Sequence, residues 1–154
     1  MKKSKSKNSK RENLDETSIQ LDILQNARFA TILFMLGCFL NFIEYNYSEK
    51  AIFQSMSNID ESVIRDNEIK AAVIAKDVSI IFLIAIIIFT DNAFTTLELQ
   101  PTNIPLDRST PSSKSNKSAI QSSRIIALFD LLKVLGYLGA SIGYSLALEN
   151  LENP

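Results

Sequence analysis

The sequence predicts an all-α, polytopic membrane protein with three transmembrane helices and an amphipathic helical connection between the first two. The chain has 154 residues, and its apolar residues are gathered into three blocks with most of the charges between them. Each block either approaches or exceeds the roughly 20 apolar residues that a helix needs to cross a bilayer. Three such segments in so short a chain are difficult to place in a soluble domain.

The first apolar block is Phe29–Ile43, fifteen residues without a charge. It is slightly short for a spanning helix, but Arg28 can extend its charged head to the interface at one end. Tyr45 and Tyr47 suit the headgroup region at the other end. We therefore predict a span at about residues 27–47, with a buried core helix of a soluble protein as the alternative.

The connection between the first two blocks has the periodicity of an amphipathic helix over residues 48–70. Its apolar residues recur at spacings of four, three and four, and charged residues cover the opposite face: the apolar set is Ile52, Met56, Ile59 and Val63. The pattern is too short for a coiled coil. It predicts a helix that either lies on the membrane or continues the spanning helices outward.

The second block has its apolar centre at Ile80–Phe89, a run rich in β-branched residues. Such a run also suits a buried strand, because periodicity does not separate the two structures. The flanking segments Ala71–Ala75 and Ala93–Leu97 extend a helical pattern on both sides. They favour a spanning helix at about residues 73–97.

The third block, Ile125–Leu148, has 24 residues and only two charges. It holds two pairs of small residues four positions apart, Gly136/Ala140 and Gly139/Gly143. Small residues at this spacing let two membrane helices approach closely, although glycine is also generally more common in membrane helices. We predict a span at about residues 125–148 that packs through Gly136, Gly139, Ala140 and Gly143.

The remaining segments are polar and set the domain boundaries. Residues 1–16 form a basic tail with almost nothing to bury, so we expect it to be disordered. Residues 100–123 are rich in serine and proline and predict a flexible linker. The membrane domain is thus expected to cover residues 17–148, and residues 149–154 form a short acidic tail.

The distribution of basic residues predicts the orientation. With the amino terminus in the cytoplasm, eleven Lys and Arg lie on the inner side and four on the outer side, and Lys133 lies within the third span. The positive-inside rule favours this arrangement. We therefore predict a protein of the cell membrane with its amino terminus in the cytoplasm and its carboxyl terminus outside.

Four charged residues are expected at similar depth near the inner side of the bilayer. Helical rise places Asp91 and Asp130 about 10 Å from the midplane, with Lys133 deeper and Arg28 near the interface. Unpaired charges in hydrocarbon are costly, so we expect these residues to pair. They serve either as electrostatic contacts that fix the helix order or as part of an ion or proton path. A smaller pairing is expected near the outer side, among Glu44, Lys76 and Asp77.

Composition removes several kinds of chemistry. The chain has no His and one Cys, Cys38, so His-based catalysis and Cys/His zinc sites are excluded. A net charge of −1 argues against nucleic acid as a partner. We predict no enzyme activity, cofactor or metal. The expected partners are the lipid bilayer and either another membrane protein or a second copy of the chain.

Three functional hypotheses follow. The first is a small membrane protein that acts through helix packing, as an accessory subunit, scaffold or immunity-type protein. The second is a pore-forming or transport component that works as a homo-oligomer. The third, an intramembrane enzyme with Asp91 and Asp130 as a catalytic pair, lacks the flanking sequence motifs that such a pair would need.

Overall fold

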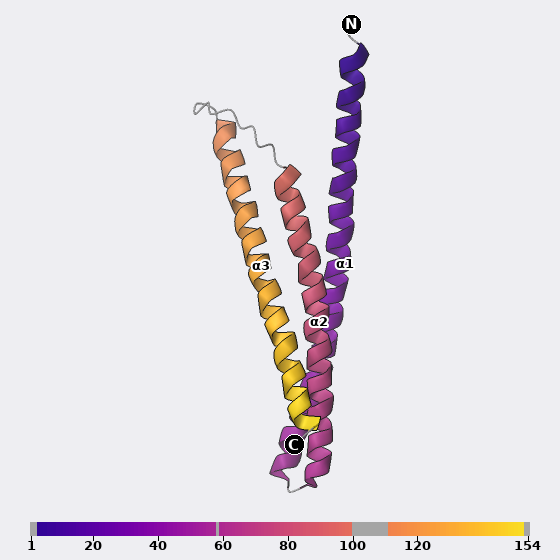
Figure 1. Ribbon diagram of the computed structural model, residues 1–154, viewed down its shortest axis with the longest axis vertical. Coiled ribbons are helices and arrows are strands. Elements are labelled where there is room, and N and C mark those ends of the chain that lie inside the picture. The colour runs from indigo at the N-terminus through magenta and orange to yellow at the C-terminus, as the bar shows by residue number, and fades with distance from the viewer. Residues whose placement is uncertain (1–2, 58, 100–110, 153–154) are drawn as a thin grey trace.

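The protein consists of three long α-helices in a row. The computed structural model describes the backbone of residues 3–57, 59–99 and 111–152 and the side chains of residues 17–57, 59–99 and 121–152. The helices are α1 (Lys3–Met56), α2 (Glu61–Leu99) and α3 (Pro111–Glu152), and no strand occurs in the described part (Figure 1). Each contains a segment long and apolar enough to cross a membrane. The predicted all-α fold with three membrane-spanning helices is thus confirmed.

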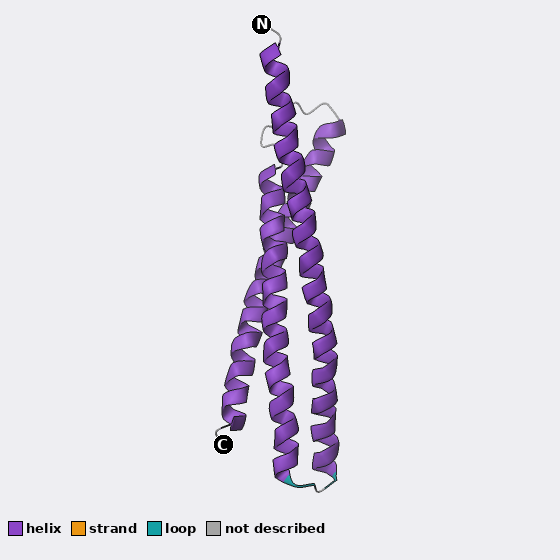
Figure 2. Cartoon of the chain, turned by 90° about the vertical axis from the view of Figure 1, so that its right-hand side faces the viewer, coloured by secondary structure: helices purple, strands orange, loops and turns teal. Residues whose placement is uncertain are grey.

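Helix α2 lies between the other two. It packs against α1 and against α3, while no backbone packing joins α1 to α3 within the described residues (Figures 1 and 2). In the most apolar window of α2, 28% of the residues are buried, against 11% in α1 and in α3. Large apolar side chains are therefore exposed on all three helices, as expected of helices that can cross a membrane.

The two ends of the bundle carry different parts of the chain. At one end, which we call the hairpin end, α1 turns into α2 and α3 finishes (Figure 1). There Arg65 donates two hydrogen bonds to the carbonyl oxygen of Leu151, from Nε at 2.8 Å and from Nη2. Carbonyl groups in the last turn of a helix lack helical partners, and a cation next to them is favourable. The amino terminus lies at the opposite end, so successive helices alternate in direction as three spans require.

The connection between α1 and α2 is a tight turn and not a separate amphipathic helix. The Asp60 side chain caps α2, because Oδ1 accepts a hydrogen bond of 3.0 Å from the Ser62 amide. The Asp60 carbonyl oxygen also accepts from the Val63 amide at 3.0 Å. Both helices thus continue outward, which was one of the two predicted arrangements. The prediction that one helix carries the apolar residues of this connection is wrong, because the turn separates them. Before the turn lie Ile52 and Met56, and Ile59 and Val63 come after them; all four are exposed.

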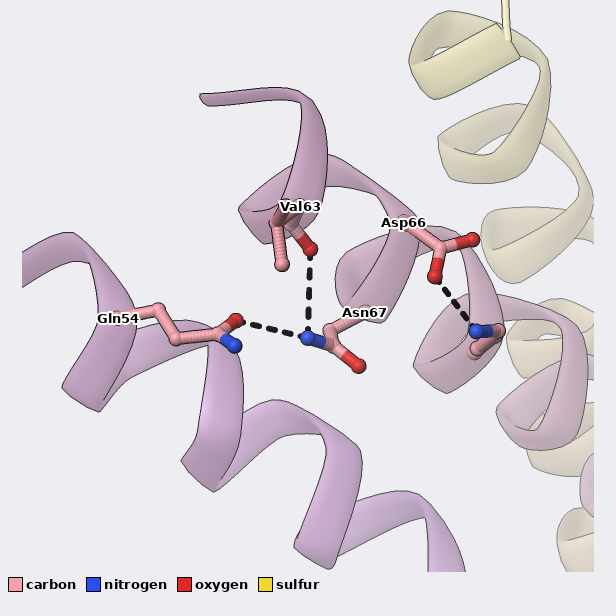
Figure 3. Close-up of polar contacts among 5 residues, drawn as sticks. Gln54, Val63, Asp66 and Asn67 are labelled. Carbon is pink, nitrogen blue, oxygen red and sulfur yellow. Dashed lines mark hydrogen bonds and ion pairs between the residues drawn. The ribbon is translucent and has the colours of Figure 1, made fainter. Parts of the chain in front are cut away.

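A polar contact fastens α1 to α2 near this turn. The buried Asn67 amide nitrogen donates to Gln54 Oε1 at 2.7 Å and to the Val63 carbonyl oxygen at 3.3 Å (Figure 3). Beside it on α2, Asp66 and Lys70 form an exposed ion pair of 2.5 Å. Hydrogen bonding and proximity to Asp66 raise the pKa of Lys70. Asn67 therefore links α2 to α1 close to the turn.

Two predicted boundaries differ from the observed helices. Helix α3 begins at Pro111, so the predicted linker of residues 100–123 ends earlier than expected, and residues 100–110 lie outside the described part. Proline suits the first turn of a helix because its φ is already helical and its missing N–H is not needed there. Helix α1 begins at Lys3, within the basic tail. The side chains of residues 1–16 are not described, and the disorder of that tail stays a prediction.

Small residues line the contacts between helices. The buried apolar residues are mostly alanines, which let the helix axes approach: Ala30, Ala51, Ala71, Ala75, Val78, Ala85, Ile86 and Ala127. Among the four glycines, Gly37 on α1 is the one that lies against another helix. A Cβ atom built there would lie 2.5 Å from Cε1 of Phe82 on α2. The absence of a side chain at Gly37 is thus what admits the Phe82 ring.

Candidate functional site

Four aromatic rings join the three helices at the middle of the bundle. Phe34 of α1 lies 5.0 Å from Phe82 and 6.0 Å from Phe89 of α2, measured between ring centroids. Tyr137 of α3 lies 5.3 Å from Phe82 and 6.5 Å from Phe34. Aromatic pairs at such distances are stabilising. Gly37 supports this cluster by making room for the Phe82 ring.

Buried polar side chains of α2 mostly have partners within the bundle. The amide nitrogen of Asn92 donates to the Ile23 carbonyl oxygen on α1 at 3.1 Å. The hydroxyls of Ser79 and Thr90 donate back to carbonyl oxygens of their own helix, those of Lys76 and Ile86. In lipid no water satisfies such groups, so each needs a partner inside the protein. Asn92 and Asn67 therefore hold the α1–α2 hairpin near its two ends.

The structure brings together two of the four charged residues predicted to cluster near the inner side. Asp130 and Lys133 on α3 form an ion pair of 2.9 Å. The Asp130 side chain is only 12% exposed, whereas that of Lys133 is 57% exposed. Arg28 and Asp91 are exposed and form no ion pair with any other residue whose side chain is described. The spacing of three residues on one helix predicts the first pair well, whereas depth alone does not bring residues of different helices together.

Three of the four predicted packing residues of α3 face away from the described part of the chain. Gly136, Gly139 and Gly143 are exposed, and a Cβ atom added at any of them would meet nothing within 4 Å. Ala140 is partly buried. Within this chain the glycines therefore contact no other helix, and their predicted packing stays a prediction about a second polypeptide. The sequence analysis missed Gly37, whose signal is a lone glycine within a run of bulky apolar residues.

A groove runs along α2 between α1 and α3 toward the hairpin end. Its first hollow, of about 270 Å³, is lined by Phe82, Tyr137, Tyr144 and Glu44 among others. The next hollow, of about 390 Å³, shares Glu44, Ala75 and Tyr144 with the first. A third, of about 400 Å³, continues past Glu68 to Arg65. The groove exists because α1 and α3 flank α2 without closing on each other.

Glu44 is the acidic residue that the first two hollows share. Its Oε1 accepts a hydrogen bond of 2.8 Å from the Ser48 hydroxyl, one turn further along α1. The pairing of Glu44 with Lys76 and Asp77 is not observed, because no ion pair joins these three described residues. The sequence predicts Glu44 at one end of the first span but does not predict the groove. A groove between helices depends on packing angles that periodicity does not encode.

The described residues contain no group of three or more acidic or cysteine side chains arranged to hold a metal ion. Cys38 is free and exposed on the surface of α1. No family model, curated protein or solved structure matches this chain. Three features of the structure can thus indicate a function: the groove, the outward face of α3 and the Asp130–Lys133 pair.

Proposed function

We propose that this protein acts through helix packing within the membrane, as an accessory subunit, scaffold or immunity-type protein without enzyme activity. The observation that supports the proposal is the outward face of α3. Gly136, Gly139 and Gly143 lie there in open space on a helix that is long and apolar enough to cross a membrane. A glycine offers lipid chains no side chain to contact, whereas it lets the backbone of a second helix approach closely.

The glycines belong to a longer stripe on the same face. The stripe continues at spacings of four and three residues on both sides of the glycines. Large exposed apolar residues occupy these positions, three before the glycines and one after them: Ile125, Phe129, Leu132 and Leu146. A repeat of 3.5 residues is typical of helices that pack along their whole length with a left-handed crossing. Bulky residues toward the start of α3 and glycines further along suit a partner helix that comes closest at the glycines.

Substitution of the glycines tests this proposal. We expect Gly139→Leu and Gly143→Leu to leave the three-helix fold intact, because a Cβ atom added at either position meets nothing within 4 Å. Both should weaken association with the partner by forcing the two backbones apart. The measurement is the yield of crosslinked or co-purified partner from membranes at equal abundance of the variants. Leu131→Ile and Leu138→Ile are the controls, and equal loss in all four variants would contradict the proposal.

A pore-forming or transport component that works as a homo-oligomer is the second candidate function. Exposed charged residues in apolar helices favour it: Lys133 is 57% exposed, and Asp91 is exposed without a described ion-pair partner. In an oligomer such residues would face one another or a hydrated path and not lipid. Ion flux through vesicles that contain the purified protein distinguishes this function from pure helix packing.

We further propose that the amino terminus is cytoplasmic and the carboxyl terminus lies outside, on the basis of the basic residues counted above. Single cysteines at Ser4, Ser57, Ser113 and Asn153, in a Cys38→Ser background, test the orientation. An impermeant thiol reagent applied to intact cells should label the cysteines at Ser57 and Asn153. It should not label those at Ser4 and Ser113 until the cells are opened. Labelling of the Ser4 and Asn153 positions from the same side would rule out three spans.

A further inference from the structure

We propose that the groove beside α2 is a binding site for a lipophilic organic cation, with the Glu44 carboxylate as its counter-ion. The inference is independent of the proposed helix packing, because the groove lies between α1 and α3 whereas the glycines lie on the outward face of α3. Three features of the groove carry it: its acidic residue, its aromatic wall and its shape.

The acidic residue lacks a positive partner. Glu44 lines both hollows, Glu68 also lines the larger one, and neither hollow is lined by a Lys or Arg of the described part. Arg65 lines only the third hollow, nearer the hairpin end. Ser48 donates one hydrogen bond, which a neutral carboxyl would also accept, so it does not replace a counter-ion. A carboxylate within an apolar helix attracts a cation strongly, because the surrounding dielectric constant is far below that of water. The groove is thus suited to a positive ligand.

The wall next to Glu44 is aromatic. Tyr45, Phe82, Tyr137 and Tyr144 line the same hollow as Glu44, and the Phe82 and Tyr137 rings are 5.3 Å apart. Aromatic faces attract cations through their quadrupoles and also contact alkyl or aryl groups on the ligand. A small hydrated metal ion would use neither property. The aromatic wall therefore selects an organic cation with apolar substituents over an inorganic one.

The shape of the groove gives such a ligand room and a route. The aromatic hollow of about 270 Å³ joins the hollow of about 390 Å³ through their shared residues Glu44, Ala75 and Tyr144. The floor of the second hollow is made by Ala71, Ala72 and Ala75, whose small side chains keep it open. Ligand-binding sites of proteins have volumes of this order, about 300–1,000 Å³. The apolar part of a ligand fits along the alanines while its charge stays at Glu44.

Tetraphenylphosphonium is the probe that tests the proposal. We expect the full chain in nanodiscs of zwitterionic lipid to bind labelled tetraphenylphosphonium saturably in equilibrium dialysis, with one site per chain. Glu44→Gln should weaken binding by at least about tenfold, since opposite charges a few ångströms apart at an effective dielectric constant near 20 attract by several kcal/mol. Glu44→Asp, which keeps the charge, should retain most of the affinity.

Three controls make the result specific to the groove. Glu49→Gln removes an exposed carboxylate from the same helix that lines neither hollow, and it should leave binding unchanged. Tyr144→Leu should bind more weakly than Tyr144→Phe, because only the phenylalanine keeps the ring. Tetraphenylborate, an anion of the same shape, should not compete. Equal binding by Glu44→Gln and the parent, competition by tetraphenylborate, or absence of saturable binding would each overturn the proposal.

Discussion

Replacing Gly37 by Val is expected to lower the free energy of unfolding by about 1–3 kcal/mol, the usual cost of overpacking a well-filled core. A Cβ atom at this position would lie 2.5 Å from Cε1 and 2.9 Å from Cδ1 of Phe82. The ring has little freedom to move aside, because Phe34 and Tyr137 pack against it. The loss should appear as a lower temperature or detergent concentration at the midpoint of unfolding, together with reduced abundance in membranes.

Two further variants separate this steric effect from a general intolerance of β-branched residues. Gly139→Val carries the same substitution on α3, where an added Cβ meets nothing within 4 Å, and it should unfold at nearly the same midpoint as the parent. Adding Phe82→Ala to Gly37→Val removes the clashing ring and should recover part of the lost stability. If Gly37→Val and Gly139→Val are equally stable, the close approach of α1 to α2 at this point is incorrect.

Replacing Lys133 by Leu should destabilise the protein by about 2–3 kcal/mol, somewhat less than the 3–5 kcal/mol typical of breaking a fully buried ion pair. The reason lies with Asp130, whose side chain is 12% exposed and would lose the ammonium group 2.9 Å away. At position 133 itself the substitution only places an apolar side chain where the half-exposed Lys133 was. Reversible unfolding in mixed detergent measures the change, and a variant as stable as the parent would mean that the pair contributes nothing.

The double variant distinguishes a structural role of the pair from transport. If Asp130 and Lys133 only stabilise the bundle, Lys133→Leu with Asp130→Leu should regain much of the stability, since no charge remains unpaired. Ion flux in reconstituted vesicles should then be the same for the parent and the double variant. A double variant that is stable but has lost a flux shown by the parent would instead assign Asp130 to a transport path.

The sequence predicts the number, type and approximate position of the helices because these depend on local composition. The apolar runs around Phe29–Ile43, Ile80–Phe89 and Ile125–Leu148 each lie within one observed helix. The Asp130–Lys133 pair is likewise local, since three residues on one helix bring two side chains together. Features confined to a single helix are therefore predicted well.

Features that depend on two or three helices are predicted poorly. The sequence does not predict the turn between Met56 and Glu61, because the apolar spacing around it continues across the reversal of direction. The Asp60 cap was a usable signal for that turn. The close approach at Gly37, the aromatic cluster and the groove at Glu44 require knowledge of which helix faces which. Composition gives the depth of a residue in the membrane but not its direction around the helix axis.

The central position of α2 has a consequence for cooperativity. Among the contacts described, α1 and α3 meet only through the Phe34–Tyr137 ring pair. The α1–α2 hairpin and helix α3 packed on α2 thus form two separable folding units. The hairpin precedes α3 in the chain, and its hydrogen bonds from Asn67 and Asn92 join α2 to α1 without α3. Detachment of α3 is therefore a sub-global opening that leaves the hairpin folded, whereas unfolding of α2 disrupts both units together.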